Sequence, residues 1–495
     1  MEAPTNIFKE KPPLWLQSLL KRFPRAGVYL VGGMVRDMLL GRPSNDYDFV
    51  VRGVTAKTLE KFLRDYGLVN LVGKNFGVFK FTPKGQTQHD AVDIALPRTE
   101  HSLGLTGGYR DFDVQSDHRL PIAQDLQRRD FTVNAMAFDL RKKRIIDPCG
   151  GLSDLAAKRL RTVGQPELRF QEDYSRLLRA IRFAVQLGFE IEYNTWKTLK
   201  LMAGFVRSPR LPREMAGREF LKTLEANPLQ AIDLLDVSGV LRVLAPEALH
   251  MKGCAQSPGY HSEGDVWDHS RLAVEALFSR DFRKQFPKAG VSVELILAAW
   301  WHDIGKPYTK TLHGNGHSFY GHEEVGARLI ADICRRLRLS SYDGLINTER
   351  ISWLARNHLV ITFTPPHQIS PTRLEETFLT HSAGQELLQL IFADQWASRQ
   401  ENGNLSIRNF YETVEVLREI RKAGYGSGRR PKILLTGNDI MARLGLAPGP
   451  RIGEILHRVR LAQLQKKIRT SSQAIEYLSR NYGQKTQSRK RRRTA

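Results

Sequence analysis

The stretch Tyr29-Leu-Val-Gly-Gly-Met-Val-Arg-Asp-Met-Leu-Leu-Gly-Arg-Pro-Ser-Asn-Asp-Tyr-Asp-Phe-Val-Val51 decides the fold of the first part of the chain. Its pattern predicts a short apolar strand, a break at Gly32-Gly33, a helix with apolar residues at helical spacing, and a second strand. The second strand carries Asp46 and Asp48. Because side chains two residues apart on a strand share a face, we expect both carboxylates to point into one space.

These pieces together suit phosphate chemistry. A diglycine lets backbone N–H groups approach a triphosphate closely, and the helix that follows offers its positive N-terminal end. Arg36 lies within reach of phosphate, and Asp46 and Asp48 are the oxygen ligands that Mg²⁺ prefers. Metal held there activates a 3′-hydroxyl and stabilises departing pyrophosphate, so the string is typical of nucleotidyl transfer. The alternative interpretation is a glycine turn followed by a solvated strand end.

Length and composition limit the class of protein. The chain has 495 residues, which suggests roughly three or four domains. No run approaches the roughly 18 apolar residues of a membrane span, and the N-terminus lacks the layout of a signal peptide. Three widely spaced cysteines indicate neither a disulfide framework nor a cysteine zinc site, which favours a cytoplasmic setting. A net charge of +23 favours nucleic acid as partner over a membrane surface.

The rest of the first domain is predicted to alternate helices and strands. A helix is expected over residues 13–23 and another over 56–66, with strands at 68–72, 78–82 and 89–94. Asp93, on the last of these strands, is a candidate third carboxylate near the metals, or else a strand-end residue paired with an arginine. The aperiodic segment 98–125 is expected to form a loop beside the site.

The next polar cluster lies at residues 128–134. Arg128, Arg129, Asp130 and Asn134 are predicted to open an apolar helix, where they would suit phosphate or ribose binding; the alternative is a charged first turn capped by Asp130. The first domain is expected to close near Gly151.

A helix is predicted from residue 170 to 189, and its polar residues recur every three positions in one stripe: Asp173, Arg176, Arg179 and Arg182. Such a stripe forms ordinary surface ion pairs or, more specifically, reads a base. Cytosine and adenine each present an amino donor beside a ring-nitrogen acceptor, which an Asp and an Arg complement. Uracil and guanine reverse that pattern and would leave buried groups unsatisfied.

Four strings resemble the class II tRNA nucleotidyltransferases, the CCA-adding enzymes, whose motifs bacterial poly(A) polymerases share. They begin at Leu30 (Leu-Val-Gly-Gly-Met-Val-Arg-Asp-Met-Leu-Leu-Gly), Asp46 (Asp-Tyr-Asp), Arg128 (Arg-Arg-Asp-Phe-Thr-Val-Asn-Ala) and Glu172 (Glu-Asp-Tyr-Ser-Arg-Leu-Leu-Arg-Ala-Ile-Arg-Phe-Ala). The resemblance covers roughly residues 28 to 245. It implies an α+β fold, with a polymerase-β-like head of mixed sheet and helices followed by all-α neck, body, HD and tail domains.

The same resemblance assigns the site. It implies Asp46 and Asp48 as catalytic Mg²⁺ ligands, and nucleotide binding by Gly33, Arg36, Arg128, Arg129, Asp173, Arg176, Arg179 and Arg182. The loop around residues 98–113 resembles the flexible segment of the family.

A second set of residues spreads over residues 260–394: Tyr260-His-Ser-Glu-Gly-Asp-Val-Trp-Asp-His, Trp301-His-Asp-Ile-Gly-Lys-Pro, Gly321-His-Glu, Asn357-His and Ala393-Asp. Imidazole and carboxylate groups on several helices can surround a divalent metal, whereas any one histidine alone more simply caps or packs. The ordered series resembles the HD metal-dependent phosphohydrolase domain. This resemblance implies metal ligands at His269, His302, Asp303 and Asp394, with His322 and His358 as further contributors and the metal unidentified.

We therefore expect a head at residues 1–151, a neck and body at 152–246, an HD domain at 247–400, a helical tRNA-binding region at 401–483 and a disordered basic tail at 484–495. The function expected is template-independent addition of CCA to tRNA from CTP and ATP, without a membrane or an obligatory protein partner. Poly(A) polymerase, CC-only or A-only addition, and an HD phosphohydrolase acting on RNA ends remain alternatives, beside a non-catalytic RNA-binding protein.

Overall fold

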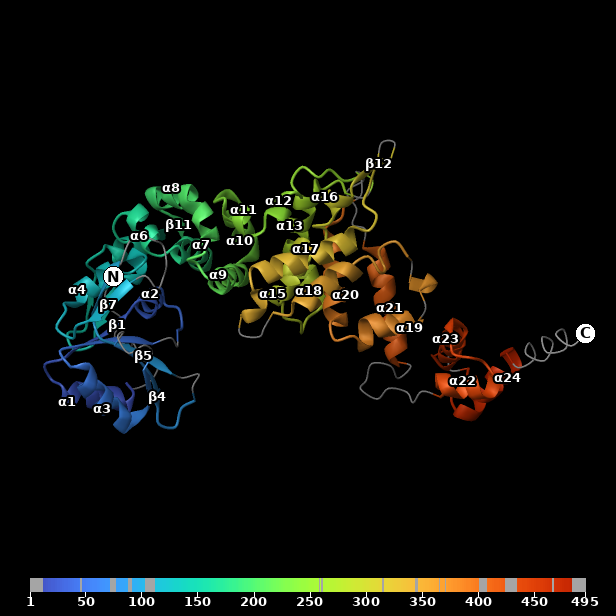
Figure 1. Cartoon of the computed structure of the whole chain (residues 1–495), viewed down its shortest axis with the longest axis horizontal. Coiled ribbons are helices and arrows are strands. Elements are labelled where there is room, and N and C mark those ends of the chain that lie inside the picture. The colour runs from blue at the N-terminus through green and yellow to red at the C-terminus, as the bar shows by residue number, and fades with distance from the viewer. Residues whose placement is uncertain are drawn as a thin grey trace, which may run out of the picture. The chain divides into compact units, whose positions relative to one another are not determined.

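The computed structural model describes residues 12–44, 47–71, 77–87, 91–102, 112–257, 259, 261–313, 316–342, 346–364, 366–369, 371–399, 407–422, 434–464 and 467–482. The chain divides into two compact units, which are described separately: residues 1–246 with 336–342, and residues 247–335 with 343–495 (Figure 1). Three expectations lie outside the described residues: those for Asp46, for residues 103–111 of the loop, and for the basic tail.

The first unit is built on a mixed sheet. In the described part of this unit seven strands form it in the order β3-β4-β5-β2-β1-β8-β9, and only β2 and β5 run parallel. The strands are β1 (Gly27–Val31), β2 (Asp48–Arg52), β3 (Gly67–Leu71), β4 (Val78–Pro83), β5 (Val92–Ala95), β8 (Ala137–Asp139) and β9 (Arg144–Ile146).

Alternating side chains give this sheet two buried faces. On one face Trp15, from helix α1 (Leu14–Arg22), packs edge-on against Phe49 and Phe81. On the other face Tyr29, Val31 and Val50 pack with apolar residues of helix α4 (Ile122–Gln127). Because Asp48 is two residues before Val50, its side chain belongs to this second face. Helices α2 (Gly33–Leu39), α3 (Ala56–Tyr66) and α5 (Gly151–Ala156) and the antiparallel hairpin β6 (Arg98–Ser102)–β7 (Phe112–Ser116) complete this part. The expectation of a loop over residues 98–125 is therefore wrong for the described residues, most of which belong to this hairpin and to the start of α4.

The helix predicted to begin at Arg128 is wrong. Helix α4 ends at Gln127 with Arg128 as its C-cap, and the chain continues as a short 3₁₀ turn, η2 (Thr132–Asn134), before β8. Tertiary contacts hold this segment: the Thr132 hydroxyl donates to Asp154, and its backbone N–H donates to the Arg161 carbonyl. The β-branched residues Thr132 and Val133 add little helix propensity to oppose them.

The helix predicted from Phe170 to residue 189 is also corrected. It is two helices, α6 (Pro166–Glu172) and α7 (Ser175–Leu187), separated at Asp173, whose backbone is extended. The Asp173 carboxylate accepts the Ser175 backbone N–H at 2.8 Å, a local hydrogen bond two residues along the chain that competes with a continuous helix. The stripe of four residues on one helix is therefore broken, because Asp173 precedes the helix that carries the arginines.

Helices make up most of the remainder of the first unit, as expected for the α+β fold, with one parallel pair of two-residue strands, β10 (Arg159–Leu160) and β11 (Glu190–Ile191). They are α8 (Tyr193–Met202), η3 (Ala203–Arg207), α9 (Arg213–Ala226), α10 (Pro228–Val237) and α11 (Val240–Leu244), with η4 (Leu339–Ser341) returning from later in the chain.

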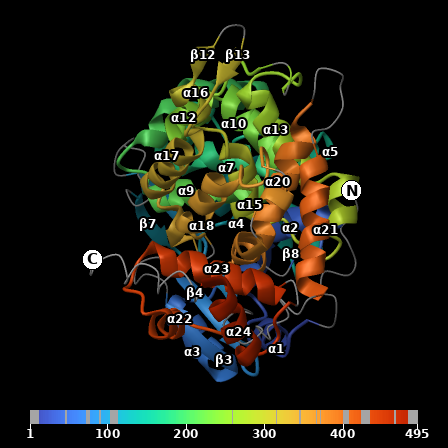
Figure 2. The same cartoon turned by 90° about the vertical axis from the view of Figure 1, so that its right-hand side faces the viewer.

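The second unit is also mainly helical. Helices α13 (Val266–Ala276), α15 (Val293–Trp301) and α20 (Gly384–Ala397) lie side by side in its centre (Figure 2). Around them lie α12 (Pro246–Leu249), α14 (Arg280–Gln285), α16 (Lys306–Thr309), the hairpin β12 (Thr311–His313)–β13 (Gly316–Ser318), α17 (His322–Arg336), α18 (Thr348–Asn357), η5 (Pro366–Gln368), α19 (Pro371–Leu374), the π-helix η6 (Glu375–Thr380) and α21 (Arg408–Lys422).

The last three helices, α22 (Gly437–Leu444), α23 (Pro450–Leu464) and α24 (Ser471–Tyr482), share a small apolar core of their own. Among the described residues, no helix combines the length and the hydropathy needed to cross a membrane.

Candidate functional sites

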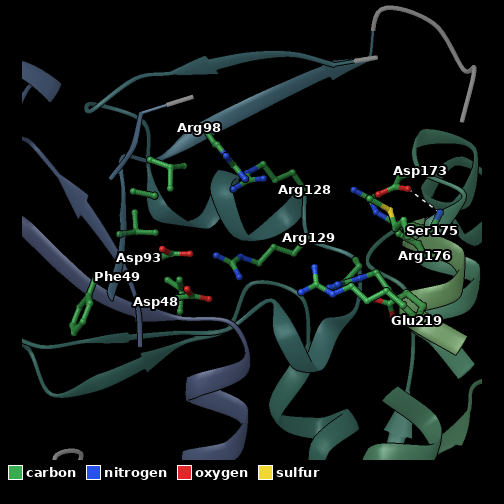
Figure 3. A pocket seen from close by; sticks show the side chains of 18 residues that line it. Asp48, Phe49, Asp93, Arg98, Arg128, Arg129, Asp173, Ser175, Arg176 and Glu219 are labelled. Atoms are coloured by element: carbon green, nitrogen blue, oxygen red, sulfur yellow. Dashed lines mark hydrogen bonds and ion pairs between the residues drawn. The ribbon is translucent and has the colours of Figure 1, made fainter. Parts of the chain in front are cut away.

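A pocket of about 670 Å³ opens in the first unit, between the sheet and the helices that follow it. Its polar lining changes character along its length. Asp48 and Asp93 lie at one end, Arg98, Arg128 and Arg129 in the middle, and Asp173 and Arg176 at the other end (Figure 3). The lining also includes Asp130, Ser175, Arg179, Met215, Arg218 and Glu219.

The carboxylate end of the pocket is set by strand register. Strands β2 and β5 are parallel, and Asp48 is the Cα partner of Asp93. The two side chains point toward one another from neighbouring strands (Figure 3). Two converging carboxylates are the kind of ligand that Mg²⁺ takes, so these residues fit such an ion. Asp46, the other expected ligand, is outside the described residues.

Arg128 and Arg129 both pair with one carboxylate, that of Asp125, which is fully buried. Arg128 donates to its Oδ1 from Nε at 3.0 Å and from Nη2 at 2.9 Å, and Arg129 Nη2 lies 3.7 Å from Oδ2. The backbone N–H of Arg98, the first residue of the hairpin, also donates to Oδ1 at 3.2 Å. One carboxylate therefore fixes three parts of the pocket wall.

The diglycine makes room for this cluster. Gly32 has φ of +70°, and a Cβ placed there would stand 2.6 Å from Nη1 of Arg129. Gly33 begins α2. A larger residue at position 32 would therefore be strained and would push against an arginine of the pocket.

The structure does not place Arg36 among the residues that line the pocket. Its guanidinium is buried, pairs with Asp37 at 2.8 Å and donates to Asn134 Oδ1 at 2.6 Å. It therefore joins α2 to the turn η2, behind the pocket wall, and its expected contact with triphosphate stays a prediction.

Asp130 continues the same network toward α7. Its Oδ1 accepts from the amide of Asn134 at 3.3 Å, and its Oδ2 accepts from Nε of Arg179 at 2.9 Å. Burial alone would raise the pKa of Asp130, but the charge and hydrogen bonds of Arg179, helped by the charge of Arg176, lower that pKa to about 2. Arg179 thus supports the pocket floor through an ionised carboxylate.

Asp173 and Arg176 form the far end of the pocket. One oxygen of Asp173 accepts the Ser175 N–H. Nη1 of Arg176 is held by the Glu172 carboxylate and by the Arg169 carbonyl, and within the described chain its Nη2 makes no hydrogen bond. The site thus keeps one acceptor and one donor side by side, which is the complement of a cytosine or adenine edge.

Arg182 lies outside the pocket lining. It pairs through Nε with Glu219 of α9 at 2.6 Å, so it anchors a lining residue instead. Sequence reasoning did not single out Arg98, Ser175, Met215, Arg218 or Glu219. Three of them, Met215, Arg218 and Glu219, belong to α9. The sequence of α9 is that of an ordinary amphipathic helix and gives little indication of a binding site.

A second polar centre occupies the core of the second unit, and all six residues expected there meet. Four ligand atoms come together in a first set: Nε2 of His269, Nε2 of His302, Oδ2 of Asp303 and Oδ1 of Asp394. The distances recorded between them run from 3.0 Å to 3.8 Å. Ligands about 2.0–2.2 Å from one tetrahedral metal stand roughly 3.4 Å apart, so this set fits one ion.

A second set shares Asp303. Its other oxygen, Oδ1, lies 3.1 Å from Nε2 of His322 and 3.5 Å from Nε2 of His358, and those two nitrogens are 3.4 Å apart. Within the described chain neither oxygen of Asp303 makes a hydrogen bond of acceptable geometry despite these short distances. Such short distances without hydrogen bonds suit atoms that share a metal ion as ligands, and the Asp303 carboxylate would then belong to both sets.

The charges of this centre are strongly coupled. Burial lowers the pKa of His302, but the neighbouring carboxylates of Asp303 and Asp394 raise it to about 10. Burial would raise the pKa of Asp303, and the charges of His302 and Lys306 hold it well below its ordinary value. Lys306 Nζ lies 2.6 Å from Asp303 and donates to Gln256 at 2.7 Å. The two buried carboxylates thus require positive charge beside them.

A pocket of about 510 Å³ opens onto this centre. Asp303, Lys306 and Asp394 form part of its polar wall, and Tyr320 and Phe363, which are both exposed, form part of its apolar wall. Its size suits a small organic ligand or the end of a chain.

A mixed sheet that brings two aspartates beside an arginine cluster defines a metal-dependent nucleotidyltransferase. Comparison with protein families agrees: the chain matches the poly A polymerase head domain over residues 28–161, the HD domain over 268–381 and a putative tRNA nucleotidyltransferase domain 2 over 367–478. The chain belongs to the tRNA nucleotidyltransferase family, as its sequence motifs predicted.

Individual relatives agree with this assignment. The chain is 30% identical to the A-adding tRNA nucleotidyltransferase of Deinococcus radiodurans over 96% of its length and 98% of the relative. It is 38% identical to the multifunctional CCA protein of Neisseria gonorrhoeae over 63% of its length and 69% of the relative. A solved CCA-adding enzyme with ATP has the same fold, with a TM-score of 0.60 and 23% identity over 96% of each chain.

Proposed function

We propose that this enzyme adds C, C and A to the 3′ end of tRNA from CTP and ATP and releases pyrophosphate. The observation that carries the proposal is the order of groups along the first pocket. The carboxylates would hold the metal, the arginines the triphosphate and the Asp–Arg pair the base, and these groups follow one another in that order along the pocket (Figure 3). The names of the two relatives, which specify tRNA and CCA or A addition, support the substrate.

Each part of the pocket has a role in this proposal. Asp48, with Asp46 and Asp93, would hold Mg²⁺, which supplies charge for the triphosphate and activates the 3′-hydroxyl. Arg128 and Arg129, aimed by Asp125, bind phosphate oxygens.

The base-binding end of the pocket works by hydrogen bonding alone. The Asp173 oxygen that does not accept from Ser175 accepts from the exocyclic amino group of the base. Nη2 of Arg176 donates to the ring nitrogen, and Glu172 keeps that guanidinium in place. The pair thereby selects CTP and ATP over UTP and GTP without a template.

The rest of the chain is proposed to hold the RNA. Residues 401–483 would contact tRNA, and the basic tail 484–495 would add affinity without specificity through phosphate contacts. Three unpaired cysteines suit a reducing cytoplasm.

The test uses three RNAs: tRNA lacking CCA, tRNA ending in CC, and an unstructured RNA. Each is offered CTP alone, ATP alone and both, with Mg²⁺, and products are resolved at single-nucleotide length. We expect three additions to the first tRNA, one to the second, then arrest. Addition of A only after CC would make the enzyme A-adding, like its relative from D. radiodurans. Two additions and a halt would make it CC-adding, and long ladders from ATP on all RNAs a poly(A) polymerase.

We propose a second activity, metal-dependent hydrolysis of phosphate esters at RNA ends, in the second unit. The convergence of His269, His302, Asp303 and Asp394 beside a 510 Å³ pocket supports it. Imidazoles and carboxylates favour a transition metal, whose identity the ligands leave open.

Paired variants test the two activities separately. Asp48→Ala is expected to abolish nucleotide addition and leave hydrolysis of bis(p-nitrophenyl) phosphate intact, and His302→Ala to do the reverse. Loss of hydrolysis in Asp48→Ala would show that the second unit is not an independent active site.

A further inference from the structure

The motif that precedes α13 contains two residues with no role so far, His261 and Glu263. Glu263 is almost completely buried, with its side chain 2% exposed. Its Oε1 lies 2.7 Å from Nδ1 of His261 and 2.7 Å from Nδ1 of His269. Its Oε2 accepts the backbone N–H of Arg399 at 2.8 Å. The Arg399 N–H is a donor, and both imidazole Nδ1 atoms lie within hydrogen-bond distance of the same carboxylate.

This arrangement fixes the tautomer of both imidazoles. An ionised carboxylate only accepts hydrogen bonds, so both Nδ1 atoms must carry hydrogen. In the neutral rings each lone pair is then left on Nε2. For His269 that atom belongs to the first ligand set, 3.0 Å from Asp394 Oδ1. A metal-bound histidine commonly gives its other N–H to such a carboxylate.

His261 presents its Nε2 elsewhere. The residue lines the 510 Å³ pocket, and in the described part of the chain this Nε2 makes no hydrogen bond. Its ring meets that of His269 edge to face, with centroids 4.9 Å apart. Contact with Glu263 on one side and His269 on the other leaves His261 little freedom to rotate.

We propose that Glu263 is a positioning residue that orients two histidines at once. It directs Nε2 of His269 to the metal and Nε2 of His261 into the pocket. There His261 accepts a hydrogen bond from a hydroxyl group of a bound phosphate ester or from a water molecule beside it. The inference rests on the proposed hydrolase function of the second unit.

Glu263 is suited to this role because it is held from two sides. The loop that carries it leads into α13, which bears His269, while Arg399 follows α20, which bears Asp394. The hydrogen bond from Arg399 therefore ties the carboxylate to the end of the helix that supplies the opposite ligand.

Metal affinity is the first readout. Co²⁺ is titrated into the full-length protein with excess Mg²⁺ present to fill the carboxylate site of the first unit, and its visible absorption reports binding. Glu263→Gln places an amide N–H against the imidazole or backbone donors. We expect it to weaken Co²⁺ binding about 10- to 100-fold, as loss of such partners does elsewhere. The exposed Glu349→Gln serves as matched control and is expected to bind as the unmodified protein does.

Two further variants keep the test independent of folding defects. Glu263→Asp retains the buried charge with a shorter arm and is expected to lose Co²⁺ affinity too. His261→Asn keeps a donor toward Glu263 and removes the Nε2 acceptor. It should leave Co²⁺ affinity within about threefold and lower kcat/KM for bis(p-nitrophenyl) phosphate about tenfold.

The outcomes separate the two proposals. Unchanged Co²⁺ affinity in both Glu263 variants would overturn the positioning role while leaving the hydrolase in place. Equal loss of affinity in His261→Asn and Glu263→Gln would overturn the separate role of His261. Absence of Co²⁺ binding in the unmodified protein would overturn the hydrolase proposal, and this inference with it.

Discussion

The pair of Asp130 and Arg179 offers a quantitative test of how the segment between α4 and η2 is joined to α7. Lowering the pKa of Asp130 from 3.8 to about 2 corresponds to about 2.4 kcal/mol of native-state stabilisation, at 1.36 kcal/mol per pKa unit. The Arg179 side chain is 35% exposed, so solvent screens part of this energy and we expect a coupling of about 1–2 kcal/mol between the two residues.

A double-mutant cycle measures this coupling. Asp130→Asn, Arg179→Met and the double variant are unfolded in urea and followed by far-UV circular dichroism, with a separate transition fitted for each unit. The pKa of Asp130 is lowered in the folded state. The coupling should therefore be equal at pH 6 and pH 8, begin to fall below about pH 4, and vanish as the pH passes about 2.

The exposed pair of Glu60 and Arg64 on α3 is the matched control, because its arginine is 59% exposed. We expect a coupling of about 0.5 kcal/mol or less there. A coupling between Asp130 and Arg179 no larger than the control, or one that changes between pH 6 and pH 8, would refute the assignment of an ionised buried pair.

Three other substitutions probe the two sites. Gly32→Ala should raise KM for CTP about tenfold with little change in KM for tRNA, because the new Cβ stands 2.6 Å from Arg129; an unchanged KM for CTP would contradict this. Asp173→Ala should admit UTP and GTP more than it weakens triphosphate binding, and continued exclusion of both would show that Asp173 does not read the base. Gly305→Ala should abolish Co²⁺ binding in the second unit and lower its melting temperature. The added Cβ would lie 2.1 Å from the His322 carbonyl oxygen, and Co²⁺ binding equal to the unmodified protein would contradict that contact.

The sequence predicts the fold well where local pattern and tertiary structure agree. The helix expected at residues 56–66 is α3, and the strand beginning at Val78 is β4. Apolar periodicity and turn residues suffice for these elements because their tertiary contacts bury the same residues that the local pattern makes apolar. The polar centre of the second unit is expected from the resemblance of its ordered histidines and aspartates to the HD domain, and the residues named on that ground do converge.

Prediction fails where hydrogen bonds other than those of a helix hold the backbone. The Asp173 carboxylate accepts the Ser175 N–H where what reads as one helix divides, and the Thr132 N–H bonds to the Arg161 carbonyl instead of continuing the predicted helix. A partner far along the chain is equally hidden: Arg36, whose expected contact with triphosphate stays a prediction, donates to Asn134, 98 positions away in the sequence. No local pattern reveals such a partner, because the contact exists only once the sheet has formed.

The single carboxylate of Asp125 limits how this pocket can diverge. Arg98, Arg128 and Arg129 all depend on it, although they belong to two separate stretches of sequence. A lineage that replaced Asp125 would remove the hydrogen-bond acceptor of Arg98 and Arg128 and the ion partner of Arg129 at the same step, and no single second substitution could restore all three. The residue at position 125 should therefore vary far less among relatives than its lack of contact with substrate suggests. The hairpin β6–β7 and the pair of Arg128 and Arg129 should be conserved together.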